Sequence, residues 1–138
     1  MRKGFTLVEI MIVVAVVIVL VTLAIPNILS SRRVANEGAA VANLRTINNA
    51  CQLYNINKET FPELLEIMVP DYLDSEISGG RKQGYQYIYT LVDQDHFTIN
   101  ANPTSTGLLK GKFYFMDDSG VVRWNQSGPA GAGDEIVK

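Results

Sequence analysis

Glu9 is the ionisable residue with the most unusual setting, because it is the one charged side chain in the apolar run Phe5–Ile25. On insertion scales, a charged side chain at the centre of a bilayer costs ~2.5–3.5 kcal/mol, and the cost is smaller near the membrane interface. A carboxylate in such a run needs a partner. We therefore expect Glu9 to pair with a positive charge, and the alternative is a side chain that extends to the membrane interface.

His96 and Cys51 are each the only residue of their type in the chain. A single cysteine allows no intramolecular disulfide, and the two residues make no Cys/His metal framework. His96 lies beside an expected turn and has no serine or cysteine nucleophile in a recognisable motif, so we expect no enzymatic activity. Cys51 is expected in the core, since a buried thiol behaves as a small hydrophobic group. A redox or cross-linking role for Cys51 is the alternative.

Two acidic pairs are the candidate metal ligands, Asp93 with Asp95 and Asp117 with Asp118. Ca²⁺ is coordinated by carboxylate and carbonyl oxygens from loops, and both pairs offer such oxygens. Neither pair matches an EF-hand loop, and the run Asp-Asp-Ser-Gly at 117–120 is also typical of a hairpin turn. We expect no cofactor, with calcium at these turns as the alternative.

The segment that positions Glu9 is the apolar run itself. A helix rises ~1.5 Å per residue, so the 21 residues of Phe5–Ile25 span about 30 Å, the thickness of a bilayer core. A secretory signal peptide has a shorter apolar core of roughly 7–15 residues, whereas here Pro26 follows and the helical pattern continues. An ordinary membrane anchor explains the length of the run and its basic flank, Arg2 and Lys3, but not Glu9.

The residues around Glu9 form a specific pattern, Lys3-Gly4-Phe5-Thr6-Leu7-Val8-Glu9, followed by unbroken apolar residues and closed by Pro26. This pattern resembles the prepilin motif of type IV pilins and type II secretion pseudopilins. The resemblance implies that a prepilin peptidase cuts between Gly4 and Phe5 and then N-methylates Phe5. It also implies that Glu9 pairs with the new amino terminus of a neighbouring subunit, where a buried ionic pair defines register better than it adds stability.

We expect one long helix from Phe5 to about Asn57, kinked at Pro26 because a proline removes one backbone hydrogen bond. Beyond the apolar run, apolar residues recur at spacings of three, four and seven, which predicts an amphipathic stripe that packs on a sheet. The stripe consists of Val34, Val41, Leu44, Ile47, Cys51 and Tyr54. Thr60 and Glu63 then have the spacing of a capping box, which predicts the start of a short second helix.

After residue 84 the periodicity changes to two, which is typical of strands. Alternation over 85–92 and 97–102 predicts a hairpin, and 112–116 with 121–124 predict two more strands around the turn at 117–120. The predicted fold class is therefore α+β, with the long helix packed on a small antiparallel β-sheet of three or four strands. This is the pilin fold that the N-terminal resemblance also implies.

The composition is mildly acidic, with 12 Lys and Arg against 14 Asp and Glu and a formal net charge of −2. This balance argues against general electrostatic binding to nucleic acid. The 138 residues are enough for one compact domain beside an anchor helix. We expect a leader peptide at 1–4, a transmembrane or filament-core half of the helix at 5–26, and a periplasmic or extracellular head at 27–138.

The resemblance implies a structural subunit, inserted in the bacterial inner membrane as a single-pass precursor with its N-terminus in the cytoplasm. Its implied partners are prepilin peptidase, the lipid bilayer before assembly, an inner-membrane assembly platform with its cytoplasmic ATPase, and other copies of itself in a helical homopolymer. Our first expectation is a subunit of a type IV pilus at the cell surface. The first alternative is a pseudopilin of a type II secretion system, whose short periplasmic filament acts as a piston in protein export. A plain membrane-anchored binding module is the more distant alternative.

Overall fold

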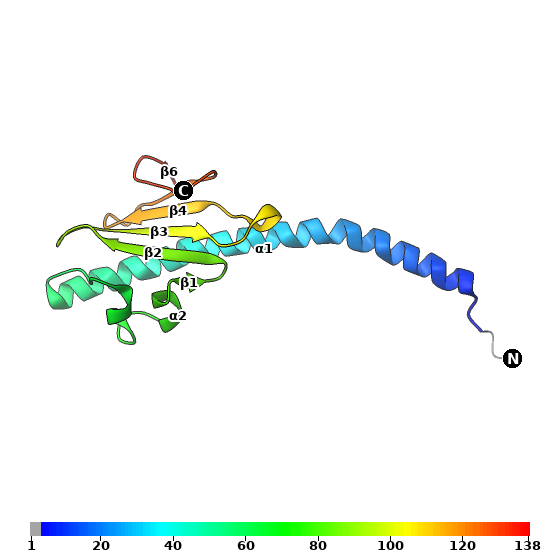
Figure 1. Cartoon of the computed structure of the whole chain (residues 1–138), viewed down its shortest axis with the longest axis horizontal. Coiled ribbons are helices and arrows are strands. Elements are labelled where there is room, and N and C mark those ends of the chain that lie inside the picture. Colours follow the sequence, from blue (N-terminus) through cyan, green and yellow to red (C-terminus); the bar gives the residue numbers. More distant parts are fainter. Residues whose placement is uncertain (1–3) are drawn as a thin grey trace.

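The computed structural model describes residues 4–138, apart from the side chain of Leu108, and its longest element is helix α1, Leu7–Lys58, with 52 residues. The helix ends at Glu59, which adopts a left-handed conformation with φ of 59° and donates its N–H to Asn55 O at 2.7 Å. The expected end near Asn57 is therefore confirmed to within one residue. Figure 1 shows that α1 curves gently and that the rest of the chain covers only its C-terminal part.

Six strands form one antiparallel sheet, in which each strand pairs with the next along the chain. They are β1 (Arg81–Lys82), β2 (Tyr85–Leu91), β3 (Phe97–Pro103), β4 (Phe113–Asp117), β5 (Val122–Asn125) and β6 (Glu135–Ile136). Strands β2 to β5 are those that alternation predicts, which confirms the α+β class and the helix-on-sheet arrangement of the pilin fold. The expected count of three or four strands is too low, because β1 and β6 have two residues each and are too short to produce an alternating pattern.

The core lies between the C-terminal half of α1 and one face of the sheet (Figure 1). The helix contributes buried residues that include Leu44, Ile47 and Cys51, and the sheet contributes alternate residues of β2 and β3. The predicted stripe is thus confirmed at its centre. At its N-terminal end the prediction is wrong, because Val34 is 59% exposed and precedes the part of α1 that the sheet covers.

Two short helices, η1 (Leu65–Met68) and α2 (Ser75–Ser78), lie in the connection between α1 and the sheet, and a third, η2 (Gly107–Leu109), lies between β3 and β4. The short helix expected after Thr60 is present as η1, but the prediction that Thr60 is its N-cap is wrong, because η1 begins at Leu65 and has no side-chain cap. Tertiary contacts at Phe61 and Pro62 fix this segment in a non-helical conformation instead. The ring of Phe61 packs edge-on against Phe97 at 4.8 Å, and Pro62 O accepts a hydrogen bond from Tyr89 Oη at 2.7 Å.

Candidate functional site: the unpartnered apolar half-helix

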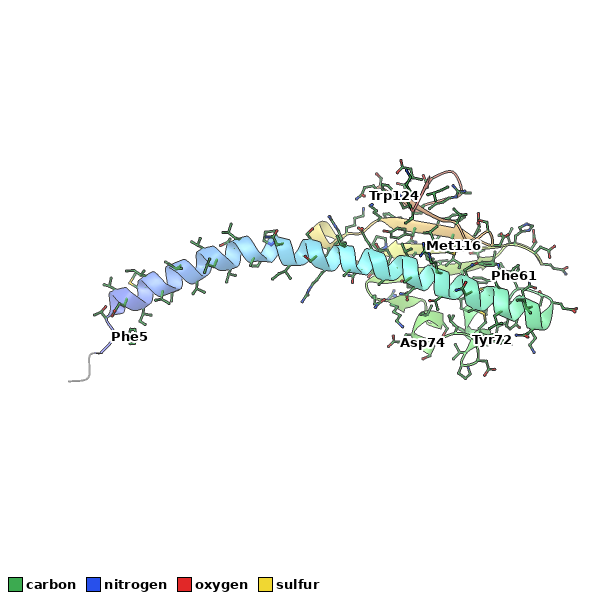
Figure 2. All side chains as sticks on the ribbon, turned by 180° about the vertical axis from the view of Figure 1, so that it is seen from behind. Phe5, Phe61, Tyr72, Asp74, Met116 and Trp124 are labelled. Carbon is green, nitrogen blue, oxygen red and sulfur yellow. The ribbon has the colours of Figure 1, made fainter. Side chains whose placement is uncertain are left out.

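The half of α1 that precedes the head is apolar on every side and contacts no other described segment. Its large apolar side chains, from Phe5 to Ile28, are exposed by between 48% and 82%. Figure 2 shows them projecting from the helix in all directions, with Phe5 at the free end. By length and composition, α1 is also the one described helix that could cross a membrane. A helix that is apolar all round is stable in a bilayer or among other apolar helices, so this half requires one of those surroundings.

Glu9 lies in the first turn of α1 and forms a capping box with Thr6. Thr6 Oγ1 accepts a hydrogen bond from the N–H of Glu9 at 3.2 Å. In return, Glu9 Oε2 accepts from Thr6 N at 3.0 Å and from the Thr6 hydroxyl at 3.1 Å. These bonds satisfy polar groups that the start of a helix leaves free, and they hold a negative charge at the positive end of the helix dipole. Sequence analysis missed this contact, although Thr6 and Glu9 have capping-box spacing.

The expected cleavage point lies directly before this capping box. Gly4 and Phe5 precede the helix without regular secondary structure, and both are exposed. A Cβ atom on Gly4 would have no described neighbour within 4 Å. The peptide bond between Gly4 and Phe5 is therefore accessible in the isolated chain. Arg2 and Lys3, the expected cytoplasmic cations, lie outside the described residues.

Helix α1 continues through Pro26 without interruption. Polar side chains on either side of the proline donate hydrogen bonds to carbonyl groups one turn earlier. Thr22 Oγ1 donates to Ile18 O at 2.5 Å, and Ser31 Oγ donates to Asn27 O at 2.9 Å. The apolar half therefore satisfies these polar groups within its own helix, as an apolar environment requires. At Pro26, where we expected a kink, the helix is unbroken, and Figure 1 shows α1 as gently curved.

Buried polar side chains form hydrogen bonds between α1 and the rest of the head, and also within the rest of the head. Asn43 is buried on α1 and donates from Nδ2 to Tyr87 Oη at 2.9 Å and to Gln83 Oε1 at 3.1 Å. Tyr85 Oη donates to Lys112 O at 2.9 Å. Burial raises the pKa of Tyr85 and of Tyr87, so both remain protonated at neutral pH and act as structural hydrogen-bonding groups. Sequence analysis did not identify these contacts, because the partners are far apart in the chain.

Cys51 is fully buried on the face of α1 that packs on the sheet. Burial disfavours the thiolate and raises the pKa of the Cys51 thiol to about 12. The thiol is therefore protonated and unreactive at neutral pH, and the prediction that Cys51 belongs to the core is confirmed.

The candidate metal ligands take part in two hairpin turns. Asp93 Oδ1 accepts a hydrogen bond from Asp95 N at 2.9 Å and lies 2.8 Å from His96 Nδ1. Asp117 Oδ1 accepts from the N–H of Ser119 at 3.1 Å and also from the Ser119 hydroxyl. Within residues 4–138, the structure describes no group of three or more His, Cys, Asp or Glu side chains that could hold a metal ion. The carboxylates of Asp93 and Asp117 thus stabilise turns, and calcium binding stays an untested alternative.

Comparisons with known proteins agree with the geometry of the N-terminal segment. A family model described as the prokaryotic N-terminal methylation motif matches residues 1–25. The chain is 32% identical over 90 residues to type II secretion system core protein G of Vibrio cholerae serotype O1, a match that covers 62% of each chain. It is 33% identical over 61 residues to core protein G of Escherichia coli, covering 44% of this chain and 42% of that protein. It is 36% identical over 59 residues to the type IV wide pilus major component PilA4 of Thermus thermophilus, covering 43% of this chain and 45% of that protein.

The matches cover only part of each relative. The chain spans 62% of the length of the Vibrio protein and less than half of the other two. Residues 1–58, which end with α1, make up less than half of the 138 residues, so a match over 62% of the chain includes part of the head. The similarity to the Vibrio protein is therefore not confined to the apolar run.

Proposed function

We propose, for a chain that belongs to the type IV pilin and type II secretion pseudopilin family, that it is a structural subunit of a type II secretion pseudopilus. The observation that carries the proposal is the apolar half of α1, which is exposed on all sides up to the point where the head begins. In the precursor this half lies in the inner membrane, and in the filament it packs among the same halves of other copies. The head then forms the outside of the filament.

The pseudopilus comes before the type IV pilus in this proposal, which reverses the order of our first expectation. Two of the relatives described above are named as core protein G of type II secretion systems, and the match to the Vibrio protein extends into the head. The type IV pilus remains the second candidate, because PilA4 is similar over 59 residues. We expect leader, filament-core and head segments at 1–4, 5–26 and 27–138, with prepilin peptidase, an assembly platform and its cytoplasmic ATPase as partners.

Maturation supplies the partner for Glu9 in this proposal. Cleavage between Gly4 and Phe5 creates a positive amino group at Phe5, the residue before Thr6. Both Thr6 contacts use Glu9 Oε2, and among the described residues no hydrogen bond reaches Oε1. Oε1 is therefore available for the methylated amine of a neighbouring subunit, a charge-assisted bond that would define the register of assembly.

Intact-mass spectrometry of the protein from a sheared surface fraction and from membranes tests maturation and location together. The proposal predicts a mass that lacks residues 1–4, carries one additional methyl group and is confined to the cell envelope. The same mass in the sheared fraction would favour the type IV pilus. An unprocessed mass in cells with an active prepilin peptidase would contradict both filament proposals and leave the membrane-anchored binding module.

Two variants separate the capping role of Glu9 from the pairing role. Thr6→Ala removes the N-cap hydroxyl and keeps the carboxylate, whereas Glu9→Ala removes both the capping box and the pairing group. If Glu9 pairs with a neighbour, filament yield falls in Glu9→Ala and stays close to wild type in Thr6→Ala. Equal losses in the two variants would mean that Glu9 acts through the cap, and a normal yield from Glu9→Ala would refute the pairing role.

A further inference from the structure

We infer that the head of one subunit docks end to end on the head of another copy of this chain through opposite charges. The cationic rim, which we define as Arg32, Arg33 and Lys110, faces the acidic end of the second copy. The acidic end consists of Glu59, Asp93, Asp95, Asp117 and Asp118. The inference rests on the proposed function, because it requires copies that are parallel in one filament.

The cationic rim lies where the head begins. Figure 1 shows η2 beside α1 as the part of the head that lies nearest to the apolar half of the helix. Glu37 of α1 joins the helix to the segment that follows η2, because its Oε1 accepts from Lys112 N at 3.3 Å. The same oxygen lies 4.0 Å from Nε of Arg33, one turn earlier in α1. Arg32 and Lys110 are exposed, and the side chain of Arg33 is 40% exposed. The rim therefore presents three cations to solvent, with Glu37 as the carboxylate beside them.

The acidic end lies at the opposite end of the head. Figure 1 shows the turn between β2 and β3 and the C-terminal end of α1 together at that end. The turn between β4 and β5 is on the same side, since Gln52 in the last two turns of α1 donates from Nε2 to Asp118 O at 3.2 Å. Lys58 and His96 are the basic side chains of these segments. Five carboxylates thus outnumber them in a region built from three separate parts of the chain.

Each charged end also exposes apolar side chains. Ile28 and Val34, on the α1 segment that carries Arg32 and Arg33, are 53% and 59% exposed. Ile56, in the last turn of α1, is 76% exposed, and Val92, beside Asp93, is 60% exposed. Apolar contact with charged groups around it is the usual composition of a protein–protein interface. The two ends therefore complement each other in apolar surface as well as in charge.

Parallel packing brings these ends together. The rim and the end of α1 are separated by about 25 residues, or roughly 38 Å of helix. All heads in a bundle of parallel helices point the same way, so a copy displaced by this distance presents its rim to the acidic end of the first copy. Copies at intermediate displacements provide the contacts between the apolar halves. Opposite charges at such a junction steer association and disfavour other registers.

Anionic lipid headgroups are the other partner that a cationic rim beside a membrane-spanning segment would fit. Lipid binding accounts for the rim alone and leaves the acidic end without a role. A second copy of the chain accounts for both ends, which is why the observations favour it.

Charge reversal tests the inference in cells that assemble the wild-type filament. The first variant combines Arg32→Glu with Lys110→Glu. The second combines Asp95→Lys with Asp118→Lys, whose carboxylates accept no hydrogen bond from any described residue. We expect each variant to lower filament yield about tenfold, which corresponds to a loss of ~1.4 kcal/mol per contact. A chain that carries all four substitutions should recover the wild-type yield, because the two ends again have opposite charges. Arg81→Glu, at an exposed residue of β1, is the matched control and should assemble normally.

The outcomes are distinct. Trp124 fluorescence establishes that each variant is folded before its yield is measured. A rim variant that assembles like wild type, or a combined variant as defective as the single reversals, overturns the inference while wild-type filaments leave the proposed function intact. A defect that follows the anionic lipid content of the membrane and is not rescued by the acidic-end reversal assigns the rim to lipid. If processed wild-type protein forms no filament, the proposed function fails and the inference fails with it.

Discussion

Gly111 has the most crowded surroundings of the described glycines. A Cβ atom at this position would overlap the Tyr85 hydroxyl, and it would lie 3.2 Å from Tyr85 Cζ and 3.3 Å from Glu37 Cγ. Tyr85 is 1% exposed, and its hydroxyl donates to Lys112 O at 2.9 Å, so its ring cannot move without losing packing and a hydrogen bond. We therefore predict that Gly111→Ala destabilises the head.

The contributions give the size of the effect. Overpacking of a well-packed core costs ~1–3 kcal/mol. A weakened hydrogen bond from Tyr85 adds ~1 kcal/mol. The lower freedom of alanine in the unfolded chain offsets ~0.4–1 kcal/mol of this. The expected net loss in the free energy of unfolding is therefore ~1–3.5 kcal/mol.

The assay is urea unfolding of the full chain in detergent micelles, followed by the fluorescence of Trp124, which is the only tryptophan. Tyr85→Phe removes the hydroxyl that the new Cβ would overlap. The double variant with Gly111→Ala should therefore lose less stability than the sum of the two single variants, by ~1–2 kcal/mol. Gly133→Ala is the control, because a Cβ there has no described neighbour within 4 Å. A Gly111→Ala variant within ~0.5 kcal/mol of wild type, or strictly additive single changes, would refute the steric argument.

Three further predictions concern the head. Asp93 raises the pKa of His96, first through the hydrogen bond and then through its charge, so Asp93→Asn should lower the pKa of this single histidine in an NMR titration. Because the pKa of His96 is raised, the stabilisation from its charged form is complete below about pH 6.5 and is lost as the pH rises through the folded-state pKa. If the pKa of His96 is the same in Asp93→Asn as in wild type, the contact between the two side chains is contradicted. Leu44→Ala should cost ~2–5 kcal/mol in the unfolding assay, while Leu53→Ala, at a 49% exposed residue of the same helix, should stay within ~0.5 kcal/mol of wild type. Cys51 should resist a thiol reagent at pH 8 and react once urea unfolds the head, and rapid modification of the folded protein would contradict its burial.

The N-terminal part of the candidate site was predictable from the sequence. The apolar run of membrane-spanning length and the pattern from Lys3 to Glu9 are both formed by residues that are neighbours in the sequence. The spacing of Thr6 and Glu9 also predicts a capping box, but we had interpreted Glu9 only as a charge in an apolar run. The change from helical to alternating periodicity likewise predicted α1 and strands β2 to β5.

The connector and the polar contacts of the core were not predictable in this way. The local pattern at Thr60 favours a helix start, but Phe61 packs on Phe97 of β3 and the segment before η1 is not helical. Asn43 is a polar residue of the kind that usually lies on the exposed face of a helix. Its burial is possible because its side chain hydrogen-bonds to Tyr87, which lies 44 residues away in the sequence. In both cases the local conformation depends on a partner that is distant in the sequence, so a short stretch of sequence cannot predict it.

The charge distribution, too, was predictable only in part from the sequence. Each aspartate and arginine is visible in the sequence, but the gathering of Glu59, Asp93 and Asp118 at one end of the head depends on how the hairpins pack along α1. Sequence by itself determined which segment must leave water, where the long helix lies and which residues alternate in strands, because these follow from periodicity and from the free energy of transfer. Only the tertiary structure decided which faces remained free after packing, because the exposure of a side chain depends on what the rest of the chain covers.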